Sequence, residues 1–170
     1  MFASVKSILF TIALSFISIL HTVNATETFT GSLTEQILGA GYNPFASSGQ
    51  TEAGSAASCI STIVYGLRKA GYQCPYRNFR IYQREFLDQA EILDLGVTKV
   101  NDRGLVLFNR SHFTQFYEDV NGNGVVDEDD TVIHAYFHPV AITKIRDWLK
   151  KDTIRPLFYI DLTKDFACPK

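Results

Sequence analysis

The sequence predicts an α+β fold in which helices pack on an antiparallel β-sheet. One stretch, residues 55–72, repeats its apolar side chains at helical spacing. Later stretches are instead rich in β-branched and aromatic residues, which favour strands, and these cover 104–108, 111–117, 131–137 and 139–145. A short helix over 146–151 and a last strand over 154–160 complete the predicted order of elements.

Length and charge narrow the class of protein. The chain has 170 residues, of which 46% are hydrophobic and 20% charged, and this composition fits one globular domain. The formal net charge is −2, and no cluster of basic residues stands out. We therefore expect no nucleic-acid partner.

The first 25 residues predict a secretory signal peptide. Lys6 precedes an apolar stretch of about 13 residues, Ile8 to Leu20, and Val23-Asn24-Ala25 follows as a cleavage site. A membrane helix needs roughly 20 apolar residues, so an uncleaved membrane anchor is the weaker alternative. The mature domain is then 26–170, with no later membrane span, and we expect it in the periplasm or outside the cell.

Three cysteines in an oxidising compartment leave one thiol unpaired. Cys74 follows the predicted helix and Cys168 lies near the C-terminus, each directly before a proline. A disulfide between these two would tie down the C-terminal tail. Cys59 is then the remaining thiol.

Cys59 falls near the start of the predicted helix. Ser55 or Ser58 can cap this helix, and Gly71 is placed to end it. Unpaired backbone N–H groups in a first helical turn stabilise a thiolate and can hold an oxyanion, which suits a nucleophilic cysteine. The alternative is a small buried apolar cysteine.

Residues 119–130 match the twelve-residue calcium loop. Oxygen-bearing side chains occupy loop positions 1, 3, 5, 9 and 12, and Gly124 occupies position 6. The predicted ligands, with the backbone carbonyl of position 7 included, are Asp119, Asn121, Asn123, Val125, Asp127 and Asp130. Position 12 is an aspartate rather than the usual glutamate, and strands rather than helices flank the loop. We expect a structural Ca²⁺ with a Kd of about 0.1–1 mM; a solvated acidic turn is the alternative.

Two histidines flank this loop at equal distances from Asn123. If the flanking strands pair as a hairpin, His112 and His134 lie opposite each other across the ladder. Facing Cys59, they would make a nucleophile, a base and an orienting group. His134 and His138 also form a His-x-x-x-His pattern, but on an extended chain residues four apart are separated by about 13 Å, too far to share a zinc ion.

These motifs together resemble the NlpC-type cell-wall peptidases, which are papain-like hydrolases of bacterial peptidoglycan. The resemblance covers most of the mature chain and lies in residues 58–72 (nucleophile helix), 104–108, 111–113, 132–135, Trp148 and Arg155. It implies a papain-like fold with Cys59 as nucleophile, His112 as general base and His134 as orienting group. Ser58 and Ile60 depart from the family's usual Asp and Ser beside the nucleophile.

The resemblance leaves alternatives open within the same fold. In the related CHAP amidases the base begins a strand like 138–142, which would make His138 the base. An exported antibacterial amidase toxin would use the same chemistry. Tyr42 is a candidate for the second oxyanion donor, beside the backbone N–H of Cys59.

The sequence thus predicts a secreted cysteine peptidase or amidase that cleaves amide bonds in peptidoglycan stem peptides. The competing class is a non-enzymatic, exported calcium-binding module with a degenerate hydrolase fold. In that class Cys59 is inert and the histidines are structural.

Overall fold

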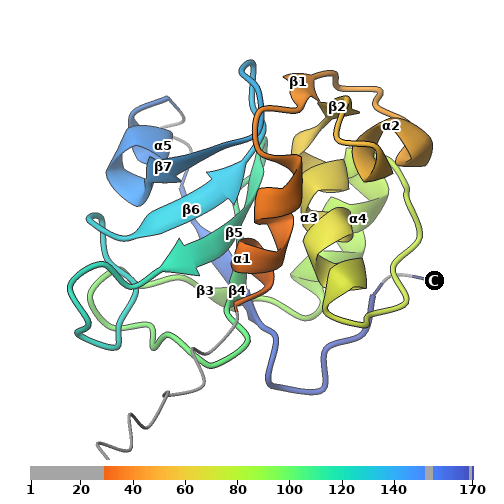
Figure 1. The fold of residues 1–170 in the computed structure, drawn as a ribbon. Coiled ribbons are helices and arrows are strands. Elements are labelled where there is room, and N and C mark those ends of the chain that lie inside the picture. Colours follow the sequence, from red (N-terminus) through yellow and green to blue (C-terminus); the bar gives the residue numbers. More distant parts are fainter. Residues whose placement is uncertain (1–28, 152–154, 169) are drawn as a thin grey trace, which may run out of the picture.

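The computed structural model describes residues 29–151, 155–168 and 170 (Figure 1). The predicted signal peptide lies outside these described residues. The elements in chain order are α1 (Thr30–Leu33), the 3₁₀ helix η1 (Thr34–Ile37), β1 (Gly41–Tyr42), α2 (Ser48–Glu52), β2 (Ala56–Ala57), α3 (Cys59–Lys69), α4 (Phe79–Leu87), β3 (Glu91–Ile92), β4 (Leu105–Phe108), β5 (Phe113–Glu118), β6 (Thr131–His134), β7 (Ala141–Lys144), α5 (Ile145–Lys151) and β8 (Phe158–Asp161).

The main sheet has six strands in the order β3-β8-β4-β5-β6-β7, and every neighbouring pair is antiparallel. Helices α3 and α4 lie on one side of this sheet, and α5 packs next to β7 (Figure 1). The combination of helices with an antiparallel sheet confirms the α+β part of the prediction.

Helix α3 begins later than predicted. Ala56 and Ala57 form β2, which pairs in parallel with β1, so the helix starts at Cys59 rather than Ser55. Ser58 supplies the N-cap through a capping box with Ser61. At the other end Gly71 has a φ of +95°, and the Tyr72 N–H bonds the carbonyl of Leu67, as in a Schellman motif.

All predicted strands form, but with shorter bounds. The third ends at His134 instead of residue 137, because the chain turns there and Phe137 adopts a positive φ of 55°. The last strand runs over Phe158–Asp161, later than predicted. Helix α4 and the short elements before α3 were not predicted.

The core occupies both faces of the sheet because β4 is buried on both sides. Val106 and Phe108 pack toward α3 and α4, whereas Leu105 and Leu107 pack with Trp148 of α5. Such double burial explains the uninterrupted apolar run that predicted this strand.

The disulfide between Cys74 and Cys168 is present, as predicted, with a Cα–Cα distance of 5.1 Å. It fixes the C-terminal tail beside the segment that connects α3 to α4. Phe166 adds edge contacts with Tyr72 and Phe86. None of the helices in the described ranges has the length and apolarity needed to cross a membrane.

Candidate active site

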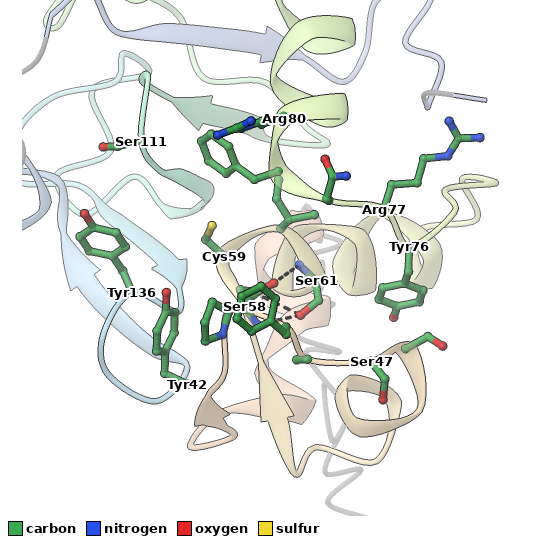
Figure 2. A pocket seen from close by; sticks show the side chains of 17 residues that line it. Tyr42, Ser47, Ser58, Cys59, Ser61, Tyr76, Arg77, Arg80, Ser111 and Tyr136 are labelled. Atoms are coloured by element: carbon green, nitrogen blue, oxygen red, sulfur yellow. Dashed lines mark hydrogen bonds between the residues drawn. The ribbon is translucent and has the colours of Figure 1, made fainter.

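A cavity of about 800 Å³ opens where α3 and α4 begin. Its walls come from the loop after β1, the start of α3, the segment leading into α4, and two residues from the sheet side, Ser111 and Tyr136. Cys59 lies in this lining, and its sulfur projects from the start of α3 into the cavity (Figure 2).

Cys59 is the first residue of α3 and is not in a disulfide. Its sulfur accepts backbone N–H groups of Phe113, Ile60 and Cys59 itself, which favour the thiolate. Burial outweighs them and raises the pKa of the Cys59 thiol to about 11. A thiolate at neutral pH therefore needs a neighbouring cation. Because the backbone of Phe113 hydrogen-bonds the sulfur, Cys59 lies next to the residue that follows His112 in the sequence.

His112 and His134 form a buried hydrogen-bonded pair. Nε2 of His112 lies 2.7 Å from Nδ1 of His134, and Nε2 of His134 lies 2.7 Å from Oγ1 of Thr143. Both rings are almost fully buried. The predicted contact between the histidines is confirmed, and Thr143 extends it into a three-membered chain.

The predicted register of this hairpin is wrong by two residues. Gln115 pairs with Ile133, so His134 lies opposite Thr114 and the two histidines meet diagonally. The bulge between Phe116 and Glu118 moves the pairing one residue back toward the predicted register. Glu118 and Thr131, the residues that flank the twelve-residue loop, pair with each other, so the hairpin is symmetric about the middle of this loop and not about Asn123.

A tight turn holds His112 in place. Oδ1 of Asn109 accepts the backbone N–H groups of Ser111 and His112 at 2.9 and 2.8 Å, and the Asn109 N–H donates to the His112 carbonyl at 3.0 Å. The Tyr136 ring packs on the His112 ring with 4.4 Å between centroids. Sequence reasoning missed these neighbours; the only signal for Asn109 was an Asn three residues before a candidate base, which suits an Asx turn.

Gln115 connects the histidine strand to the cysteine helix. Its Nε2 donates to the carbonyls of Ile63 and Thr62, at 2.8 and 3.3 Å, and its Oε1 accepts the Thr34 hydroxyl at 3.1 Å. A Cβ on Gly66 would lie 2.4 Å from Oε1 of Gln115, so only glycine allows this approach of α3 to β5. The fully buried amide therefore fixes how the two elements sit together.

Tyr42, the predicted oxyanion donor, also lines the cavity. Pairing of β1 with β2 sets Tyr42 opposite Ala57, two residues before Cys59. Burial raises the pKa of its hydroxyl, and the neighbouring Cys59 and Tyr136 raise it further, so the hydroxyl keeps its proton. Figure 2 shows Tyr42 and Tyr136 together on one side of the sulfur.

His138, the alternative base, lies in the turn between β6 and β7. Its Nδ1 donates to the carbonyl of Pro139 at 2.6 Å, and its ring packs on that of His134 with centroids 4.9 Å apart. Like His112 and His134, it is not among the described residues that line the cavity. The structure therefore places His138 against the orienting histidine, His134.

The predicted calcium loop closes the far end of the β5–β6 hairpin and gathers four of its predicted ligands. Nδ2 of Asn121 and Nδ2 of Asn123 both donate to Oδ2 of Asp127, at 2.7 and 2.8 Å. The carboxylate of Asp119 accepts three backbone N–H groups of the loop at 2.8–3.3 Å.

The other two predicted ligands have additional roles. Asp130 is fully buried and accepts the N–H groups of Val120 and Asp127 at 3.2 and 2.8 Å. Burial raises its pKa to about 6, and the nearby charges of Asp127 and Asp119 add to the rise. Val125 forms a single β-bridge with Lys99. Within the described residues, no three His, Cys, Asp or Glu side chains are grouped so as to hold a metal ion.

Neither a protein-family model nor a curated protein matches this chain.

Proposed function

We propose that this protein is an exported cysteine hydrolase of amide bonds with an NlpC-type, papain-like arrangement of its site. One observation carries the proposal. A cysteine at the first position of α3 opens into a cavity, and its sulfur bonds the residue beside a buried His112–His134–Thr143 chain. This is the order of nucleophile, base and orienting group that acyl transfer requires.

Each nitrogen in the chain has a defined role in the proposed mechanism. In the tautomer we propose, Nε2–H of His134 donates to Oγ1 of Thr143, and Nδ1 of His134 accepts from Nε2–H of His112. This tautomer puts the lone pair of neutral His112 on Nδ1, where it takes the proton of the Cys59 thiol. The resulting imidazolium is the cation that the thiolate needs in a site whose burial raises the thiol pKa.

The thiolate sulfur then bonds to the amide carbonyl carbon, and the C=O π electrons move onto the oxygen. The N–H of Cys59 and the hydroxyl of Tyr42 donate to that oxyanion. Collapse breaks the C–N bond, and the leaving amine takes the proton from His112. Water, deprotonated by His112, hydrolyses the thioester and restores the thiol.

The resemblance supplies the proposed substrate, the peptide stem of peptidoglycan. The test is digestion of purified peptidoglycan, with released amines and fragments followed by mass spectrometry. Wild type should release stem-peptide fragments and Cys59→Ala should not. Equal digestion by both proteins would contradict the cysteine mechanism.

The second candidate is an exported calcium-binding module without enzymatic activity. One observation favours it: a thiol with a pKa of about 11 is inert at neutral pH unless His112 ionises it. Slow alkylation of folded Cys59 at neutral pH, with no digestion of peptidoglycan, would favour this module.

We also propose that Ca²⁺ binds the Asp119–Asp130 loop in either class. The amides of Asn121 and Asn123 already converge on Asp127, and a flip of each amide would turn its oxygen toward that point. Carboxylate and amide oxygens are the ligands that calcium prefers. Isothermal titration with CaCl₂ tests the proposal, and no heat at millimolar calcium would contradict it.

A further inference from the structure

The cavity beside Cys59 is positively charged along one wall. Among the described residues that line it are Arg77 and Arg80, and none is an aspartate or glutamate. Both arginines are exposed. The ion pairs found within the described part of the chain involve neither of them. Figure 2 shows both on the side of the cavity where α4 begins.

The backbone adds charge of the same sign. Helices α3 and α4 both start at this cavity, and neither has an acidic residue in its first turn. The N-terminal end of each helix dipole is partially positive. Since the whole protein has a net charge of −2, the positive character is local to this cavity.

The carboxylate of Glu52, which reaches the lining residue Tyr76, is already shared. Glu52 accepts the Tyr76 hydroxyl at 2.9 Å, and its carboxylate also lies within 3.6 Å of Arg68 and 3.8 Å of Lys69. It therefore does not neutralise Arg77 or Arg80.

We propose that Arg77 and Arg80 form a specificity subsite for a carboxylate on the substrate, so that acidic peptides are preferred over neutral ones. This inference rests on the proposed function and names the class of peptide that the site takes. A guanidinium group binds a carboxylate through two parallel hydrogen bonds, which gives both attraction and orientation.

The test compares two alkylating reagents of similar size at Cys59, neutral iodoacetamide and anionic iodoacetate, at low ionic strength. The iodoacetamide rate serves as the internal reference. In R77Q/R80Q the ratio of iodoacetate to iodoacetamide rates should fall at least about threefold, because two positive charges that line the same cavity as the sulfur are removed. The matched control is Arg84→Gln, on an exposed α4 arginine that pairs with Glu85 outside the cavity; its ratio should equal that of wild type.

An unchanged ratio in R77Q/R80Q would overturn the subsite while leaving the cysteine mechanism intact. If iodoacetamide does not label folded Cys59, the proposed mechanism fails and the subsite is judged by binding alone. The affinities of Cys59→Ser for N-acetyl-alanyl-glutamate amide and for its glutamine counterpart, measured by titration, then decide whether the subsite exists. Tighter binding of the glutamate peptide, lost in the added R77Q/R80Q background, supports the subsite; equal affinities overturn it.

Discussion

The two ends of the β5–β6 hairpin differ in how their polar groups are satisfied. At the loop end, Asp119, Asn121 and Asp127 bond partners within about ten residues along the chain. At the other end, His112 bonds His134 across the hairpin, and Gln115 bonds carbonyls of α3 more than fifty residues away. The loop end is mostly exposed, whereas the histidine end is buried.

This difference teaches that one hairpin can serve two purposes with different sensitivities. Local, solvated bonds contribute little each and leave the loop able to exchange them for a cation. Buried bonds between distant elements fix the geometry of the site, and their loss leaves unsatisfied groups without access to water. Substitutions at the histidine end should therefore have the larger effects.

The largest effect is expected from the nucleophile and the base. Cys59→Ala and His112→Ala should each lower kcat for amide hydrolysis by a factor on the order of 10⁴ or more, and His134→Ala by roughly 10² to 10⁴. His138→Ala, at a neighbouring histidine in the turn between β6 and β7, is the matched control and should stay within about threefold of wild type. A loss in His138→Ala as large as in His112→Ala would identify His138 as the base instead.

The turn that carries His112 gives the next effect. Asn109→Ala should cost roughly 2–3 kcal/mol of stability, because it removes the acceptor of the buried His112 N–H and of the partly buried Ser111 N–H. Asn109→Asp keeps the accepting oxygen and should recover most of that loss. Urea denaturation of wild type and the two variants measures the free energy of unfolding of each protein. An Asn109→Ala variant as stable as wild type would contradict this role for the turn.

At the loop end the effect depends on calcium. With a Kd of about 0.1–1 mM, 10 mM Ca²⁺ should stabilise wild type by about 1.4–2.7 kcal/mol, seen as a higher Tm than in chelator. In D119A/D127A this calcium-dependent difference should vanish. Asp102→Ala, an exposed acid outside the loop, should keep it; identical responses of D119A/D127A and wild type would contradict the calcium proposal.

The smallest expected effect is that of calcium bound at the loop end on catalysis at the histidine end of the hairpin. If calcium only orders the loop, its removal should lower kcat at the histidine end by no more than about threefold while lowering Tm. Activity measured in calcium and in chelator, well below the Tm, tests this. A loss of tenfold or more would mean that the loop controls the catalytic histidines directly.

Local signals in the sequence predicted much of this molecule. The spacing of apolar residues predicted the helix that begins with Cys59 and the apolar strand at 104–108. A single glycine, Gly71, predicted where the helix ends. The pairing of Cys74 with Cys168 followed from their positions beside a helix end and a terminus. These features depend on neighbours along the chain.

The parts that were missed depend on long-range contacts. The offset between His112 and His134 comes from where the loop is centred, and the bulge reduces this offset by one residue. The symmetry of the sequence about Asn123 reveals neither feature. Thr143, Tyr136 and Gln115 reach the site only after the sheet has formed. Helix α4, whose start brings Arg80 to the cavity, carries a mixed surface pattern that was not recognised as helical.

The most direct test of the account is the pH dependence of Cys59 alkylation by iodoacetamide in wild type and in His112→Ala, from pH 5 to 11. Burial outweighs the backbone N–H groups at the sulfur and raises the pKa of the thiol to about 11, so without a neighbouring cation the reactive thiolate should appear only as the pH approaches that value. An imidazolium at His112 would stabilise the thiolate and move the wild-type curve below the free-thiol pKa of about 8.5. The account predicts fast wild-type labelling near pH 7 and a curve for His112→Ala shifted toward pH 11. Superimposable curves, both rising only near pH 11, would contradict it.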